Sequence, residues 1–191
     1  NKIINIIIKD EIIDSAEIAG PGFINFRLNK EFWFNLVKKI LKNGETFGFS
    51  NFGKNKKVNL EFVSANPTGP LHVGHTRGAV FGDVLANLLQ KVGYIVTREY
   101  YINDAGTQID ALARSAFSRY KETLGEKYDE TQNEYPGDYL KIVGEKLKES
   151  FGEKLFSLDE QQNLEKIKKF TVKMMLADIK NDLSDLGVIM D

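Results

Sequence analysis

Cysteine is absent from this chain, and histidine occurs only twice, at His72 and His75. Without cysteine no disulfide framework can form, and this usage suits a cytoplasmic protein. Two imidazoles three residues apart could bind a metal ion, but the sequence offers neither a cysteine nor a third histidine to complete a ligand set. We therefore predict no metal-binding residues.

Long apolar runs and an excess of one charge are also missing. No stretch is long and apolar enough to cross a membrane, and the first residues do not resemble a signal sequence. The net charge of −1 argues against a surface that binds nucleic acid over its whole extent, so any RNA contact would be a local basic patch. With 42% hydrophobic and 28% charged residues, the 191-residue chain can bury the core of one domain and part of another.

The chain is organised around a polar loop at residues 64–75, which read SANPTGPLHVGH. Residues 57–63 before it are rich in β-branched and aromatic side chains, which predicts a strand. Residues 79–91 carry apolar residues at helical spacing and stop before Gly93, which predicts a helix with a glycine after its end. A second strand is predicted at 94–102. Together these elements predict a βαβ unit, in which a ligand binds where the first strand meets its helix.

Proline and glycine shape this loop. Pro67 and Pro70 fix φ at two points and make the loop stiff. Gly69 and Gly74 allow the backbone to approach a flat or charged group closely. We therefore expect a rigid binding loop.

His72 and His75 lie at the predicted helix entrance, where free N–H groups and the helix dipole favour an anion. Two imidazoles there could donate hydrogen bonds to phosphate oxygens as negative charge develops, without acting as acids or bases. This chemistry suits transfer of a nucleotide's α-phosphate. They could also be ordinary polar residues at a helix start. Arg77, two residues further on, could be a solvated helix residue, and Gly78 and Gly82 are predicted to allow close packing of the helix on the sheet.

Several stretches resemble one family. Residues 72–75 look like the first signature of class I aminoacyl-tRNA synthetases. Residues 61–79 read EFVSANPTGPLHVGHTRGA, residues 98–109 read REYYINDAGTQI, and both closely resemble arginyl-tRNA synthetases of the bacterial type. Residues 17–26 (EIAGPGFINF) look like the end of that family's N-terminal extra domain. Other nucleotidyl transferases also carry His-x-Gly-His, but the two long blocks make the signal specific.

The resemblance implies an α/β fold, namely the first half of a Rossmann-like parallel-sheet catalytic domain with a helical insertion, preceded by the end of a small α/β domain. We expect residues 1–43 to be the end of an N-terminal tRNA-contacting domain with its connecting helix. Residues 44–57 would be a linker. Residues 58–191 would be the N-terminal half of the catalytic domain, with the insertion at about 110–170. The chain would thus be an N-terminal fragment.

The resemblance also implies a two-step reaction. Arginine and ATP, with Mg²⁺, give arginyl-adenylate and pyrophosphate, and arginine then passes to the 3′ end of its tRNA. We expect a cytoplasmic monomer that binds arginine, ATP and the arginine-accepting tRNA, with no membrane contact. Some relatives carry a lysine just before the first signature, but here those positions are Thr68, Gly69 and Pro70. We therefore expect the required lysine outside this chain and the fragment to be inactive alone.

The residues carried over from the family fall into three groups. The catalytic residues are His72 and His75. The ATP-binding residues are Pro67, Thr68, Gly69, His72, Gly74 and His75. The arginine-binding residues are Glu61, Ser64, Asn66, Asp104 and Gln108.

Two of these assignments have alternatives. Strand alternation places Glu61 on the face opposite Leu60 and Phe62, where a carboxylate within a parallel sheet needs a partner. That partner could be a substrate guanidinium, which can donate two N–H groups to it, or an internal arginine or lysine, or water at the strand end. Residues 103–106 (NDAG), which include Asp104, could form a plain Asx turn instead of facing the substrate.

Further elements are predicted along the chain. Residues 23–29 alternate as in a half-buried strand after a turn at 20–22, and residues 30–41 form an amphipathic helix with Asn29 as N-cap and Gly44 as its stop. The other predicted elements are helices at 109–124 and 138–151, a capping box at 157–160 that opens a helix to residue 186, core methionines at 174 and 175, and a strand from 188.

Two other functions would account for part of the sequence. Another nucleotidyl transferase, such as a pantothenate-synthetase-like enzyme, would explain His72 to His75 but not the first thirty residues, Glu61 or Asn66. A non-catalytic RNA-binding module is disfavoured by the net charge of −1 and by the lack of an aromatic and basic array.

Overall fold

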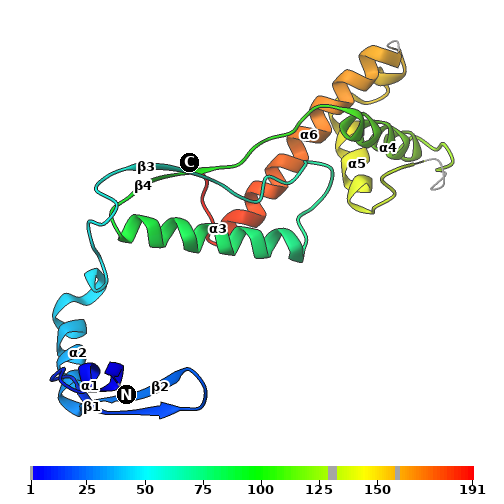
Figure 1. The fold of residues 1–191 in the computed structure, drawn as a ribbon. Helices are drawn as coiled ribbons and strands as arrows, with labels where there is room; N and C mark the ends of the chain where they lie inside the picture. Colours follow the sequence, from blue (N-terminus) through cyan, green and yellow to red (C-terminus); the bar gives the residue numbers. More distant parts are fainter. Residues whose placement is uncertain (1, 129–132, 158–159) are drawn as a thin grey trace. The chain divides into compact units, whose positions relative to one another are not determined.

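A computed structural model describes residues 2–128, 133–157 and 160–191 (Figure 1). The chain separates into two compact units, Asn1–Ser50 and Asn51–Asp191. The division falls within residues 44–57, the segment for which a linker was predicted. Each unit is described by itself.

The first unit combines a β-hairpin with two helices. Helix α1 (Lys2–Ile7) precedes the antiparallel strands β1 (Ile13–Ala19) and β2 (Phe23–Leu28), which are joined by a turn with two glycines at positive φ. The strand predicted at 23–29 is thus confirmed.

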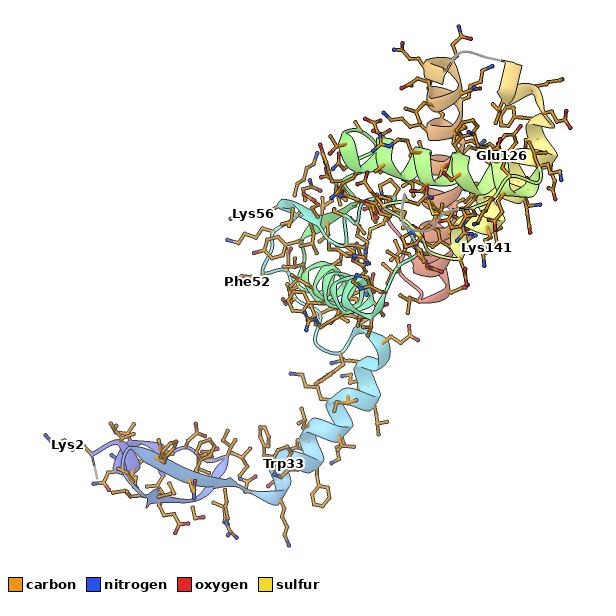
Figure 2. All side chains as sticks on the ribbon, turned by 90° about the vertical axis from the view of Figure 1, so that its right-hand side faces the viewer. Lys2, Trp33, Phe52, Lys56, Glu126 and Lys141 are labelled. Atoms are coloured by element: carbon orange, nitrogen blue, oxygen red, sulfur yellow. The ribbon has the colours of Figure 1, made fainter. Side chains whose placement is uncertain are left out.

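Helix α2 (Lys30–Asn43) completes the unit, followed by the short 3-10 helix η1 (Gly44–Thr46). Asn29 caps α2 by accepting a hydrogen bond from the N–H of Phe32 (2.7 Å), and Gly44 ends it at φ 53°, as predicted. Trp33, on the predicted apolar face of this helix, is exposed (Figure 2).

The second unit contains the predicted βαβ arrangement. Strands β3 (Lys57–Glu61) and β4 (Ile95–Glu99) pair in parallel, with Glu61 beside Glu99, and helix α3 (Val73–Lys91) runs along them (Figure 1). Helix α3 begins at the predicted entrance, with His72 as its cap, six residues before the apolar pattern of residues 79–91. Strand β3 ends before residue 63 because Val63 and Ser64 have φ angles of 67° and 41°, outside the strand region.

Two glycines of α3 were predicted to allow close packing on the sheet, and only one does. A Cβ added at Gly82 would overlap the ring of Phe62, so the helix approaches the end of β3 closely there. A Cβ added at Gly78 would meet nothing within 4 Å, so this prediction was wrong for Gly78. Gly78 faces open space rather than the sheet.

Three helices follow β4, in and beyond the segment for which a helical insertion was predicted. Helix α4 (Thr107–Thr123) packs against both α5 (Tyr139–Phe151) and α6 (Glu160–Asp185), with the 3-10 helix η3 (Lys154–Ser157) between the last two in sequence. The buried residues at their centre are Leu112, Ala113, Ala116, Tyr120, Leu140, Val143, Leu147, Leu155, Ile167 and Met175. The predicted core roles of Met175 and of the half-buried Met174 are confirmed. The capping box predicted at 157–160 lies outside the residues whose side chains are described.

The end of α6 packs beside the βαβ unit. A second core cluster joins Ala79 of α3 to Ile179, Leu183 and Val188, with Val63 packed against it. The strand predicted from residue 188 is not formed. Asp191 alone lies along β4: its N–H donates to the carbonyl of Arg98 (3.2 Å), and its carboxylate accepts from the N–H of Arg98 (2.7 Å). One paired residue does not make a ladder.

Candidate active site

The loop between β3 and α3 is held by its own turns and by the segment after β4. The N–H of Thr68 donates to the carbonyl of Asn66 (2.8 Å), and Pro67 is fully buried. Ser64 Oγ accepts a hydrogen bond from the N–H of Tyr101 (3.0 Å). These hydrogen bonds therefore fix the loop both at Ser64, a predicted arginine-binding residue, and at Thr68, a predicted ATP-binding residue.

The two histidines form a stacked pair at the start of α3. His72 Nδ1 accepts from the N–H of Gly74 (3.1 Å), and His75 Nδ1 faces the N–H of His72 at 3.4 Å. The ring centroids lie 3.8 Å apart with an angle of 20° between the planes. The pair therefore closes a reciprocal cap on the helix.

This cap decides what the imidazoles can offer a ligand. Because each Nδ1 accepts a hydrogen bond, a neutral ring carries its proton on Nε2 and is a donor there. Burial, and to a smaller extent the neighbouring His72, lower the pKa of His75 from its ordinary value of 6.5. His75 thus presents an uncharged Nε2–H donor at a helix N-terminus at neutral pH, which suits a developing anion.

The two predicted loop glycines approach flat groups of the chain itself. A Cβ at Gly74 would lie 2.9 Å from Cε1 of His72, and a Cβ at Gly69 would lie 3.3 Å from the ring of Tyr139. A side chain at Gly74 would displace His72. The backbone at Gly74 thus approaches the imidazole of His72, and the backbone at Gly69 approaches the phenol of Tyr139.

A group of amides joins the loop to the segment after β4. Asn66 Nδ2 donates to Gln108 Oε1 (2.7 Å), and Asn103 Nδ2 donates to Asn66 Oδ1 (3.2 Å). The structure thus brings together two of the predicted arginine-binding residues, which are 42 positions apart, and adds Asn103 to them. Each amide keeps unused donors or acceptors, because an amide oxygen has two lone pairs and its nitrogen two hydrogens.

Asp104 lies near a lysine of α6. Lys168 Nζ donates to Asp110 Oδ1 (2.8 Å), which raises the pKa of Lys168, and the charge of Asp104 adds to this effect. Asp104, which follows Asn103 in sequence, therefore acts on the charge of Lys168.

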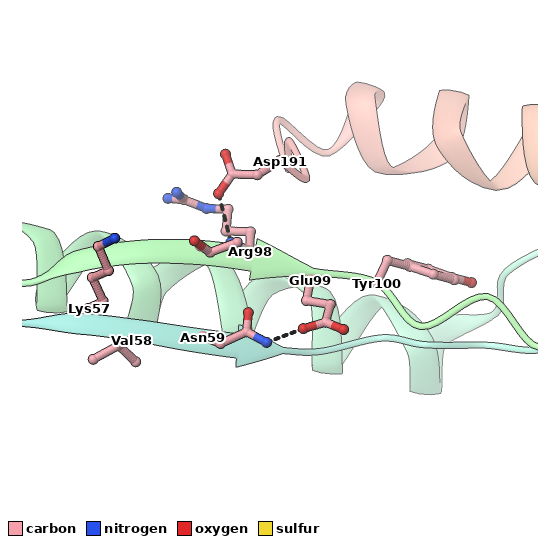
Figure 3. A pocket seen from close by; sticks show the side chains of 8 residues that line it. Lys57, Val58, Asn59, Arg98, Glu99, Tyr100 and Asp191 are labelled. Carbon is pink, nitrogen blue, oxygen red and sulfur yellow. Dashed lines mark hydrogen bonds between the residues drawn. The ribbon is translucent and has the colours of Figure 1, made fainter.

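Glu61 is exposed at the end of β3, directly beside Glu99 of β4. The amide of Asn59 donates to the carboxylate of Glu99, as Figure 3 shows. No arginine or lysine among the described residues forms an ion pair with Glu61. Glu61 lies on the strand face opposite Leu60, as predicted, because Val58 and Leu60 are half-buried and the residues that alternate with them are exposed.

Two tyrosines that sequence reasoning missed also hold the loop. Tyr100 Oη donates to the carbonyl of Ala65 (2.7 Å), and Tyr139 Oη donates to the carbonyl of Thr68 (2.6 Å). Burial raises the pKa of Tyr100, and burial together with Tyr135 raises the pKa of Tyr139 to about 12. Tyr100 lies in the block at 98–109 that resembles the family, so this resemblance could have indicated it. Nothing local in the sequence links Tyr139 to Thr68, which lies 71 positions away.

A cleft of about 510 Å³ opens along β3 and β4 (Figure 3). It is lined by Lys57, Val58, Asn59, Thr97, Arg98, Glu99, Tyr100 and Asp191. None of the predicted site residues lines it, so the cleft and the histidine pair are separate features.

Neither a metal cluster nor a membrane helix is found in the described parts of the chain. Among these residues, no three side chains of His, Cys, Asp or Glu gather as a metal site requires. Within the same residues, no helix has the length and apolar character needed to span a bilayer.

The family model for class I (R) tRNA synthetases, catalytic domain, matches residues 36–175, which include the βαβ unit and the stacked histidine pair. The model for the arginyl tRNA synthetase N-terminal domain matches residues 1–28. The chain therefore belongs to the arginyl-tRNA synthetase family. These matches confirm the fold class and do not favour the pantothenate-synthetase-like or RNA-binding alternatives.

Curated relatives agree with this assignment. The chain is 55% identical over 182 residues to an arginine–tRNA ligase of Cereibacter sphaeroides, which covers 95% of this chain and 31% of the relative. It is 49% identical over 191 residues to an arginine–tRNA ligase of Bartonella henselae, which covers 100% of this chain and 33% of the relative. The chain thus spans about a third of the length of these relatives.

Solved structures agree as well. A protein assigned as an arginyl-tRNA synthetase in Campylobacter jejuni has a TM-score of 0.72 at 37% identity, over 86% of this chain and 36% of that one. The Thermus thermophilus arginyl-tRNA synthetase, with a TM-score of 0.52 at 24% identity over 95% of this chain and 29% of that one, supports the fold.

Proposed function

We propose that these residues belong to an arginine–tRNA ligase that activates arginine with ATP and transfers it to the 3′ end of its tRNA. The observation that carries this proposal is a pair of hydrogen bonds at Asn66, which donates to Gln108 and accepts from Asn103. They join the two family blocks beside the helix that carries His72 and His75. The alternative of a pantothenate-synthetase-like nucleotidyl transferase does not explain these hydrogen bonds between the two blocks.

In the first step a carboxylate oxygen of arginine attacks the α-phosphorus of ATP, and pyrophosphate leaves. We propose that ATP enters as its Mg²⁺ complex, against Thr68, Gly69 and Gly74, while the predicted ATP-binding residue Pro67 is fully buried and holds the loop from within. The Nε2–H groups of His72 and His75 then donate to phosphate oxygens as their charge grows. Such donors are most effective when fixed beforehand, and the stacked cap on α3 fixes both rings.

We propose that the arginine head group binds at the amide group. The unused N–H groups of Asn66 and Gln108 can donate to a carboxylate, and the unused oxygen lone pairs can accept from an ammonium. We include Ser64, two residues before Asn66, and Asp104, the residue after Asn103, in the same site, where the charge of Asp104 would favour the substrate cation. In the second step a hydroxyl of the tRNA's terminal ribose attacks the activated carbonyl, and AMP leaves.

We propose that Glu61 selects the guanidinium. Its carboxylate is exposed at the carboxyl end of β3, and no described cation neutralises it. A guanidinium is planar and can donate two parallel hydrogen bonds to one carboxylate.

The remaining assignments extend the same proposal. Residues 1–43 would contact tRNA, residues 44–57 would link the units, and residues 58–191 would form the first half of the catalytic domain. We further propose that the whole protein acts in the cytoplasm as a monomer.

The test is exchange of radiolabelled pyrophosphate into ATP by the full-length protein, with and without tRNA. We expect exchange that depends on arginine and not on citrulline, whose side chain has the same shape without the charge. Exchange that requires pantoate instead, or no amino-acid dependence under any condition, would reject the function.

A carboxylate variant tests specificity within the same assay. Glu61→Gln should weaken arginine binding by about 1.5–3 kcal/mol, the scale of a hydrogen bond to a charged group, and leave ATP binding unchanged. Glu99→Gln is the matched control, because its carboxylate already accepts from Asn59. If both variants lose the same amount of arginine affinity, the effect comes from the negative charge of this region in general and not from selection by Glu61.

A further inference from the structure

The loop that leads to His72 is held from the helical insertion by one side chain. Tyr139 is the first residue of α5, and its hydroxyl donates to the carbonyl of Thr68 at 2.6 Å. Thr68 lies four residues before His72, with Gly69 and Pro70 between them. A displacement at Thr68 would therefore be passed along a short, stiff segment to the start of α3.

The ring of Tyr139 is fixed by what surrounds it. Gly69 lets the loop backbone come against the ring, since a Cβ there would lie 3.3 Å from it. A Cβ at Gly137 would overlap the same ring, so the turn before α5 also closes on it. The phenol is thus enclosed between two glycines that belong to different segments.

The turn that precedes Tyr139 is held in place as well. Arg119 of α4 is buried, and its Nη2 donates to the carbonyl of Pro136 (2.9 Å) while Nη1 pairs with Glu122 (2.9 Å). Gly144 lets α5 approach α4 closely, because a Cβ there would lie 2.7 Å from the carbonyl carbon of Arg119. These contacts make α4 and α5 a rigid support for the phenol.

We propose that Tyr139 is a positioning residue for arginine activation, and that its hydroxyl makes the helical insertion hold the loop which places His72. The inference rests on the proposed function, because it assumes that His72 acts on ATP. Burial raises the pKa of Tyr139 to about 12, so its hydroxyl remains a donor throughout the working pH range. Neither Tyr139 nor the insertion needs to touch a substrate for this role.

The substitution that isolates this hydroxyl is Tyr139→Phe, which keeps the ring between the two glycines. The matched control is Tyr135→Phe, which removes a phenol from the adjoining turn that makes no described hydrogen bond to the loop. Both variants are made in the full-length protein. Active sites are counted by the burst of adenylate formation, so that loss of folded enzyme is separated from slower chemistry.

We expect Tyr139→Phe to lower kcat of arginine-dependent exchange about tenfold per active site, because misplaced reacting groups cost rate more than binding. The KM values for ATP and arginine should stay within about threefold of the wild type, and Tyr135→Phe should match the wild type throughout. A rate per active site within twofold of the wild type, or an equal loss in Tyr135→Phe, would overturn the inference.

A second measurement does not depend on activity. Amide hydrogen exchange of the peptide covering residues 66–72 should be faster in Tyr139→Phe than in Tyr135→Phe, because only the first variant loses the bond to Thr68. Equal exchange in the two variants would overturn the inference. A wild-type enzyme without arginine-dependent exchange would instead reject the proposed function, and the two failures are therefore distinguishable.

Discussion

His72 combines two tasks in one side chain, since it caps α3 through Nδ1 and presents Nε2 outward. Asparagine is a good N-cap, so His72→Asn should keep the helix start and remove only the outer donor. We expect this variant and His75→Asn to lower the rate of arginine activation by about 10²-fold, the scale for a lost oxyanion donor. The ATP KM should change far less.

The control for these variants is Val73→Ala, because Val73 lies between the histidines and is largely exposed. Stopped-flow or exchange kinetics with the full-length enzyme measures all of them. If both histidine variants keep rates within twofold of the wild type, the pair serves only to cap the helix.

The lowered pKa of His75 sets the direction of the pH dependence. The ring is neutral at and above its ordinary value of 6.5 and gains a proton only at lower pH. A proton on Nδ1 would face the N–H of His72 and break the cap. We expect kcat/KM for exchange to be constant from pH 6.5 upward and to fall with an acid midpoint below 6.5.

Stability should follow the same sign. Between the lowered pKa and 6.5 the unfolded chain binds more protons at this residue than the folded chain, so the free energy of unfolding should rise with pH there. His75→Asn should abolish this contribution. An acid midpoint above 6.5, or one that persists in His75→Asn, would contradict the assignment.

At the scale of elements, the packing of α3 on β3 depends on one glycine and not on its neighbour four residues earlier. Gly82→Ala would drive a methyl group into the ring of Phe62, and we expect it to lower the free energy of unfolding by about 1–3 kcal/mol. Gly78→Ala meets no atom within 4 Å and should raise it by about 0.5–1 kcal/mol through helix propensity. Urea unfolding of both variants gives the comparison, and the idea fails if the two changes have the same sign.

The elements that could be predicted from sequence are those whose cause is local. Asn29 and Gly44 bound α2 as expected, because capping acts within a few residues. The entrance of α3 at His72 and His75 was predicted, but the reciprocal cap was not, because histidine is not a usual cap residue and no local pattern indicates its stacking on His75. The bonds from Asn66 to Gln108 and from Tyr139 to Thr68 join residues 42 and 71 positions apart, which only tertiary packing brings together.

At the scale of the whole molecule, we expect residues 1–191 alone to make no arginyl-adenylate. The described parallel sheet has two strands, with an open cleft along it, and a nucleotide site on such a sheet normally uses further strands. No lysine stands at positions 68–70 to help pyrophosphate leave. Purified 191-residue protein should show no arginine-dependent pyrophosphate exchange beside an active full-length control. Clear exchange, with or without tRNA, would mean that this site is complete as it stands.

The left-handed backbone at Val63 has a consequence for the order of events during synthesis. A β-branched residue in this conformation costs on the order of 1–2 kcal/mol, so the isolated loop does not adopt it unaided. The side chain of Val63 packs instead against a cluster that includes Leu183 and Val188. We therefore expect the backbone at Val63 to settle only after the end of α6 has left the ribosomal exit tunnel. The loop at residues 64–75 would then be among the last parts of this unit to take shape, although its residues are translated about a hundred positions earlier.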